Sequence, residues 1–302
     1  MVGGGPFGWE PGEWTDDTSM AVAIAEIAAT GADLRDEQAQ DALVRRWYEW
    51  SLHATDVGVQ TRSVLSRAGR HGISAQTARA ESGALHRSSG RTVGNCSLMR
   101  TAPVALAYLD DEAALVEAAR AVSELTHWDA EACDACVLWC CAIRHAILTG
   151  VLDVRIGLQH IPPERRDMWV ARLDAAEKAQ PSDFKNNGWV VEALQGAWSA
   201  ITTTPVPQDD PAKVSSESTI CAWPSTQRCE AAGTPTQSPP SQAGCSALPM
   251  GRRRCLRSGV VRCMAGRVCG AAILLISRPR SPARAYRDDA RANTSEWSDH
   301  RR

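Results

Sequence analysis

Apolar residues recur at helical spacing between residues 20 and 202, and no stretch alternates apolar and polar residues as a half-buried strand would. Residues 70–93 are polar and rich in Ser, Gly and Arg, and no helix is predicted there. An all-α body is therefore expected. The predicted helices are Met20–Ala29, Asp36–Ser51, Thr55–Gly69, Met99–Tyr108, Asp111–Glu124, Ala130–Gly150, Pro163–Ala179 and Val190–Thr202.

Charge divides the chain into two unlike segments. Residues 1–213 carry 19 Lys and Arg against 29 Asp and Glu, whereas residues 214–302 carry 14 against 6. Nine of the 11 Trp residues lie at or before Trp198, and the last segment is rich in Arg, Pro, Ser and Cys. Such a composition buries too little apolar surface to offset chain entropy, so we predict one domain over 1–213 and a disordered tail over 214–302.

Nothing in the sequence points to export or to a membrane. The N-terminus lacks a basic stretch followed by an apolar one, and no apolar run reaches the length of a membrane span. A cytoplasmic protein is expected, with its 11 cysteines reduced. Cys133 and Cys136 have a metal-like spacing, but no second pair lies nearby, which favours buried core thiols.

A compact oxygen cluster stands where a Gly- and Pro-rich loop gives way to the first predicted helix. Thr15, Asp16 and Asp17 offer two carboxylates and a hydroxyl, ligands that suit Mg²⁺ or Mn²⁺ better than zinc. The alternative is helix capping, since Asp and Thr at a helix start accept backbone N–H bonds. The cluster alone does not decide between these two interpretations.

Three further segments accompany this cluster, in order: Gly94-Asn95-Cys96-Ser97-Leu98-Met99-Arg100, then Leu125-Thr126-His127, then Asn187-Gly188-Trp189-Val190-Val191. Together with Trp14-Thr15-Asp16-Asp17-Thr18-x-Met20, they closely resemble the ADP-ribosylglycohydrolase family over roughly residues 5–205. The resemblance implies an orthogonal, all-α helical bundle. It also implies a hydrolase that removes ADP-ribose from a modified protein or from a small molecule.

The same resemblance assigns roles to individual residues. Two Mg²⁺ or Mn²⁺ ions would lie beside Thr15, Asp16 and Asp17, with the two aspartates also catalytic. Loop residues 94–100 would hold the diphosphate: Gly94, Asn95, Cys96, Ser97, Leu98, Met99 and Arg100. His127 would contact the adenosine side, and Gly188 with Trp189 would flank the adenine. Relatives usually have Gly at the position of Cys96, so this loop is expected to be tighter or shifted. Ordinary capping or packing remains the alternative for each of these residues.

Two family features are missing from the sequence. A helix that precedes the Trp-Thr-Asp-Asp loop in relatives is absent, so the domain is expected to be N-terminally truncated. A closing Gly-Asn/Asp-Thr-Asp-Thr motif is absent too, yet the codons of residues 233–245 permit it in a shifted reading frame. We therefore predict a frameshift at about Lys213, with an incomplete bundle and an out-of-frame tail.

Other functions stay open. The basic tail could be a nucleic-acid-binding arm, although it has no Lys and few aromatic residues to stack on bases. The truncated chain could bind ADP-ribose without turnover, or be an inactive fragment. The expected partner is an ADP-ribosylated protein or small molecule, with no nucleic acid, no membrane and a monomeric state.

Overall fold

The computed structural model describes residues 7–204, which form helices and no β-strand. The predicted all-α fold is thereby confirmed. The predicted frame change and the basic tail lie outside the described residues. The α-helices are α1 (Asp16–Ala28), α2 (Glu37–Ser51), α3 (Val59–Arg70), α4 (Ala75–Ser89), α5 (Ala102–Ala107), α6 (Glu112–Glu124), α7 (Ala130–Thr149), α8 (Pro163–Lys178) and α9 (Val190–Thr203). Two 3₁₀ helices, η1 (Val154–His160) and η2 (Pro181–Asp183), connect the later ones.

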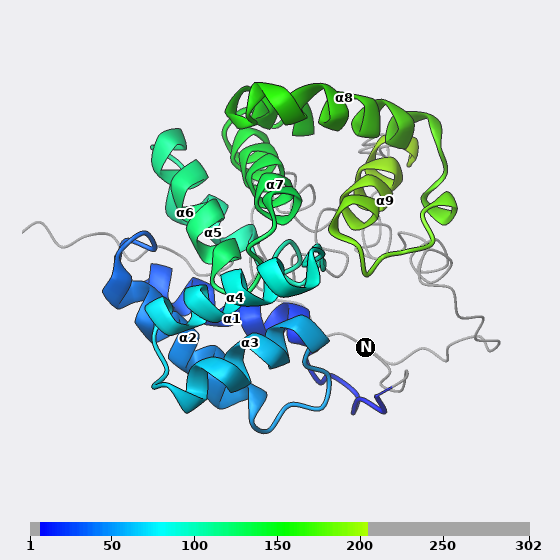
Figure 1. The fold of residues 1–302 in the computed structure, drawn as a ribbon. Helices are drawn as coiled ribbons and strands as arrows, with labels where there is room; N and C mark the ends of the chain where they lie inside the picture. Colours follow the sequence, from blue (N-terminus) through cyan, green and yellow to red (C-terminus); the bar gives the residue numbers. More distant parts are fainter. Residues whose placement is uncertain (1–6, 205–302) are drawn as a thin grey trace, which may run out of the picture.

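The helices form two groups that meet at α5 (Figure 1). Helices α1–α4 lie together at one end, where α1 packs against α2 and α3 packs against α4. Helices α6–α9 lie at the other end, where α7 contacts α6, η1 and α9, and α8 runs along α9. The short helix α5 contacts α1, α6 and α7, so it joins the two groups.

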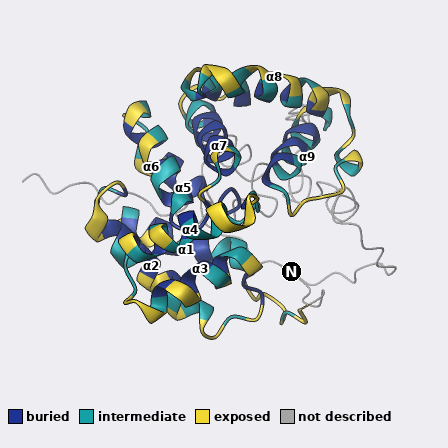
Figure 2. Ribbon diagram, viewed as in Figure 1, coloured by how far each residue is buried: buried dark blue, intermediate teal, exposed yellow. Residues whose placement is uncertain are grey.

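Helix α7 is the centre of the second group and is dark blue along most of its length in Figure 2. Asp129 caps its start by accepting the N–H of Glu131, at 2.9 Å, and Gly150 ends it in the left-handed conformation, φ 81°. Its four cysteines are buried, and none forms a disulfide with another described residue, which agrees with the core interpretation of Cys133 and Cys136.

The length and composition of α7 would also allow it to cross a membrane, which the sequence analysis did not anticipate. However, 72% of its apolar window is buried inside the bundle. That burial is typical of a core helix, and length and composition alone are weak evidence for a membrane span.

Helix α4 corrects the prediction that residues 70–93 contain no helix. A capping box starts it, in which the Ser74 hydroxyl accepts the N–H of Thr77 and the Thr77 hydroxyl accepts the N–H of Ser74. Its buried face consists of small residues rather than large apolar ones: Ala75, Ala78, Ser82 and Gly83. Such a face leaves little trace in a pattern of large apolar residues.

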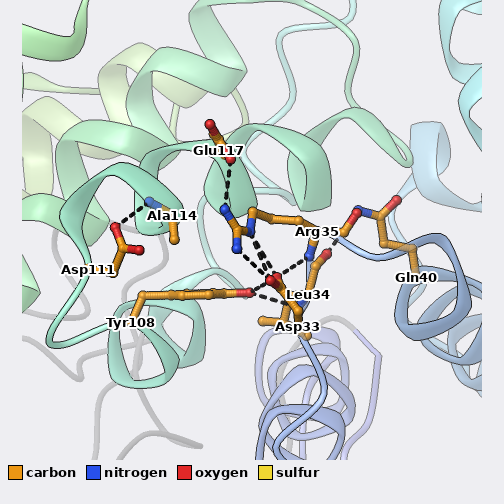
Figure 3. A network of polar contacts seen from close by, with 8 residues as sticks. All are labelled: Asp33, Leu34, Arg35, Gln40, Tyr108, Asp111, Ala114 and Glu117. Carbon is orange, nitrogen blue, oxygen red and sulfur yellow. Dashed lines mark hydrogen bonds and ion pairs between the residues drawn. The ribbon is translucent and has the colours of Figure 1, made fainter.

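A polar cluster fixes the loop between α1 and α2 to the end of α5 and to α6 (Figure 3). The Tyr108 hydroxyl donates to Asp33 at 2.6 Å and accepts the N–H of Leu34 at 2.7 Å. Arg35 binds Asp33 and reaches Glu117 on α6 at 3.0 Å. Hydrogen bonds from Arg35 hold the pKa of Asp33 well below its usual range. The loop that follows α1 is thus held by contacts from two other elements.

Candidate active site

The oxygen cluster lies at the start of α1. Thr15 precedes the helix with an extended backbone, and its side chain makes no capping bond to the helix N–H groups. Its hydroxyl instead donates to Asp17 Oδ2 at 3.0 Å, while Asp16 Oδ1 accepts the N–H of Asp17 at 3.0 Å. The side chain of Thr15 is therefore part of the acidic cluster and does not cap the helix.

A third carboxylate, Asp56, joins this cluster from the loop between α2 and α3. Its Oδ2 accepts the backbone N–H of Asp16 at 2.9 Å and the indole N–H of Trp9 at 3.0 Å. Sequence reasoning missed Asp56 because its partners lie 40 and 47 positions away along the chain. The only local sign of Asp56 in the sequence is that a single aspartate lies between two helices, directly before Val57-Gly58.

Electrostatics set this cluster apart. Burial, followed by the charges of Asp17 and Asp56, raises the pKa of Asp16 to about 7. Three converging carboxylates repel one another, and a divalent cation would relieve that repulsion. Carboxylate and hydroxyl oxygens are the donors that Mg²⁺ and Mn²⁺ prefer, so this donor set fits such an ion.

The predicted glycine-asparagine loop lies directly beside the cluster. A methyl group built on Gly58 would lie 2.6 Å from Cys96 Sγ and 4.0 Å from Asp16 Oδ2. Gly58 is therefore what lets the loop approach the carboxylates. Burial, followed by the charge of Asp16, raises the pKa of Cys96 to about 11, so its thiol stays protonated at neutral pH.

The same loop presents backbone donors. The N–H of Met99 bonds to the carbonyl of Asn95 at 3.1 Å and closes a helical turn. Within residues 7–204, the N–H groups of Cys96, Ser97 and Leu98 have no hydrogen-bond acceptor. Three such groups in one turn are a donor surface of the kind that binds phosphate.

Trp189 and Gly188 lie against this loop although they are about 95 positions later. The N–H of Asn95 donates to the carbonyl of Gly188 at 3.1 Å, and the N–H of Val190 donates to that of Val93 at 2.9 Å. The two predicted binding segments therefore meet. A pocket of about 210 Å³ opens between them, lined by Gln60, Arg91, Val93, Gly94, Asn186, Gly188 and Trp189.

The remaining predicted residues are buried and do not line this pocket: Ser97, Leu98, Met99, Arg100 and His127. The Arg100 guanidinium lies 4.0 Å from the ring centre of Trp47 and donates to Thr126 Oγ1 at 2.7 Å. His127 lies beneath the loop, since a methyl group on Gly94 would lie 3.1 Å from its Nε2. In this structure these side chains support the loop from below.

A second pocket, of about 530 Å³, reaches Asp56 from the other side. It is lined by Gly12, Glu13, Trp14, Ser19, Trp50, His53, Ala54, Thr55 and Asp56. Two carboxylates and two indole rings thus share one hollow beside the acidic cluster. Sequence analysis did not identify this pocket, because its lining comes from three separate segments.

The chain is also similar to known proteins. Residues 1–233 match the family model of ADP-ribosylglycohydrolase. An ADP-ribosylarginine hydrolase, Tri1, from Serratia proteamaculans is 26% identical over 209 residues, which cover 68% of this chain and 54% of that protein. An ADP-ribosylarginine hydrolase Tri1 from Pseudomonas putida is 29% identical over 206 residues, which cover 67% of this chain and 53% of that protein. The chain spans about half the length of these curated relatives, and because the family match covers more than half of it, the chain belongs to the ADP-ribosylglycohydrolase family.

Proposed function

We propose that this chain carries the ADP-ribose-binding part of a metal-dependent hydrolase that releases ADP-ribose from arginine. The observation that carries the proposal is the meeting of Asp16, Asp17 and Asp56 beside the donor surface of the glycine-asparagine loop. Family membership and the names of the two relatives support the substrate class.

Thr15, Asp16 and Asp17 would hold the Mg²⁺ or Mn²⁺ of such an enzyme. When bound, the metal supplies Lewis acidity at the hydroxyls of the ribose that carries the scissile bond. The chain itself supplies the orientation of those ligands, because Thr15 and Asp17 are joined by a hydrogen bond of 3.0 Å.

Asp56 is proposed to orient the attacking water. Two N–H donors occupy its Oδ2, and within the described residues no hydrogen bond reaches its Oδ1. Oδ1 is therefore the oxygen available to accept a proton from water near the ribose carbon. The N–H groups of Cys96, Ser97 and Leu98 would bind the diphosphate, and Trp189 would flank the adenine.

The larger pocket suits the arginine side of the substrate. A guanidinium group is a planar cation that binds carboxylates and stacks on aromatic faces. Glu13 supplies a carboxylate, and Trp14 and Trp50 supply the rings. This match favours an arginine-linked substrate over a neutral one.

Release of ADP-ribose from an ADP-ribosylated arginine peptide tests the proposal. We expect release to require Mn²⁺ or Mg²⁺ and to stop with a chelator. Asp16→Asn and Asp17→Asn should each lower the rate at least about a hundredfold, because even indirect metal partners are worth tenfold to a hundredfold. The control Cys136→Ala removes a buried thiol of α7 and should leave the rate unchanged. Metal-independent release, or full activity in both aspartate variants, would contradict the proposal.

A second candidate function is binding of ADP-ribose without turnover. It is favoured by one observation: within the described residues the acidic cluster consists of Asp16, Asp17 and Asp56, which would form one half of the two-metal site that the family resemblance implies. Calorimetry would then show ADP-ribose binding in a chain that releases none from the peptide. Restoring the family's reading frame after residue 213 should convert that binding into metal-dependent release.

A further inference from the structure

Three metal-binding side chains meet at a place that the proposed reaction does not use. Glu112 begins α6, Cys141 lies on α7 and His160 ends η1. One ligand atom from each lies within 4.8 Å of the other two. These residues are 19 or more positions apart in the sequence, so the packing of three elements brings them together.

Neighbouring groups hold the side chains of Glu112 and His160 in place. Glu112 Oε1 lies 2.6 Å from His160 Nε2 and accepts the Gln159 amide at 2.9 Å. Glu112 Oε2 accepts from Arg144 at 2.6 Å, and Arg144 also donates to the Leu109 carbonyl at 2.9 Å. Partners of this kind fix the orientation of metal ligands and tune their affinity.

The cluster is open on one side and closed on the other. The side chains of Glu112 and His160 are 30% and 26% exposed, whereas Cys141 is buried. Burial, followed by the charge of Glu112, raises the pKa of Cys141 to about 12, so without a cation the thiol keeps its proton. Glu112 and His160 thus face solvent, and the Cys141 sulfur lies on the buried side of the cluster.

We propose that Glu112, Cys141 and His160 bind a divalent transition-metal ion of the zinc type. Thiolate, imidazole and carboxylate together are ligands of Zn²⁺ and are disfavoured by Mg²⁺ and Mn²⁺, which prefer oxygen alone. On binding, the thiol proton leaves to solvent and His160 presents a neutral Nε2. The carboxylate and the thiolate then place two negative charges beside the ion, and Arg144 stays paired with the other carboxylate oxygen of Glu112.

The bound ion would join α6, α7 and η1, whereas the acidic cluster of the proposed reaction lies at the start of α1. Its role would therefore be structural. Zn²⁺ should raise the melting temperature of the chain by an amount that grows with the logarithm of its concentration relative to its dissociation constant, and this effect should not need ADP-ribose.

Titration of the full chain with Co²⁺, a spectroscopic substitute for Zn²⁺, tests the site. A thiolate bound to Co²⁺ gives a charge-transfer absorption band that oxygen ligands do not give. We expect this band in the wild type and its reduction by one equivalent in Cys141→Ser. His160→Gln, at a partly exposed position, should weaken Co²⁺ affinity at least about tenfold and tests the site if the cysteine variant folds poorly.

Matched controls separate this site from other metal binding. Cys140→Ser changes the neighbouring buried thiol, which contacts Thr101, and should retain the band. Asp16→Asn should also retain it, because that cluster has no sulfur among its ligands. Cysteines after residue 213 are the same in every variant and cancel in the difference. The proposal is overturned if the wild type shows no such band, or if both Cys141→Ser and His160→Gln leave it unchanged.

Discussion

Two aspartates of this chain, the buried Asp134 and the half-buried Asp16, have opposite surroundings. Asp134, in the middle of the α6–α8 group, accepts from Arg120 at 3.0 Å, from Arg165 at 2.6 Å and from the Trp169 indole at 3.3 Å. Asp16, at the start of α1, has Asp17 and Asp56 as its charged neighbours, and both raise its pKa. The first carboxylate is fully paired within the chain, and the second lies among like charges.

This difference in charged neighbours distinguishes a carboxylate that stabilises the fold from one suited to bind a ligand. A buried charge with complete partners stabilises one arrangement of helices, whereas a buried charge held beside others of the same sign makes the fold less stable. Clusters of like charge with shifted pKa values are therefore typical of functional sites, where a ligand of opposite charge offsets the repulsion.

The largest effect is expected at Asp134. Asp134→Ala would leave Arg120 and Arg165 without their buried counter-charge and should lower the free energy of unfolding by about 3–5 kcal/mol. Urea unfolding followed by circular dichroism measures it. Asp174→Ala, which removes the half-exposed partner of Arg155, is the control and should cost less than about 1 kcal/mol. If Asp134→Ala and Asp174→Ala lower the free energy of unfolding equally, burial does not distinguish these two carboxylates.

Asp16 should behave in the opposite way. Its native pKa, about 7, exceeds the ordinary 3.8, so between these values the native state binds more protons than the unfolded one. In a chelator, the stability that this proton provides is present below pH 4 and is lost as pH rises through 7. Asp16→Asn should remove this slope and raise the free energy of unfolding at pH 8 by about 1–3 kcal/mol. A variant less stable than wild type at pH 8 would refute the like-charge account.

The smallest effect concerns the approach of the loop to the cluster. Gly58→Ala should cost about 1–2 kcal/mol, because the new methyl group would lie 2.6 Å from Cys96 Sγ. In a Cys96→Gly background most of that cost should disappear, since the atom in conflict is gone. The double-mutant cycle measures the coupling directly and cancels the cost of Ala at the start of α3. Independent, additive effects would mean that the two segments do not touch.

Helices with large apolar faces could be predicted from the sequence, and a helix with a small-residue face could not. The predicted ranges match α2, α6 and α7 closely, since Leu, Val and Trp mark their buried sides. Helix α3 begins at Val59 rather than Thr55, because Asp56 points into the acidic cluster and Gly58 takes the position before the helix. Helix α4 could not be predicted, because the residues on its buried face are small.

In the candidate site, too, some residues could be predicted from the sequence and others could not. Thr15, Asp16 and Asp17 are adjacent in the sequence, so their cluster could be predicted. Asp56 could not, since nothing local shows that it reaches Asp16. The meeting of Gly94 with Trp189 depends on two backbone hydrogen bonds across about 95 positions. Proximity across such a separation is a property of packing, which no short motif contains.

The polar cluster of Asp33, Arg35 and Tyr108 has a consequence for precision at the far end of α1. A helix of 13 residues is about 20 Å long, so a tilt of only about 3° would move its opposite tip by about 1 Å. A shift of that size can cost a catalyst about a hundredfold in rate. The contacts in Figure 3 anchor the loop that follows α1, and α5 packs against α1 itself, so together they restrict such a tilt of the helix that carries Asp16 and Asp17.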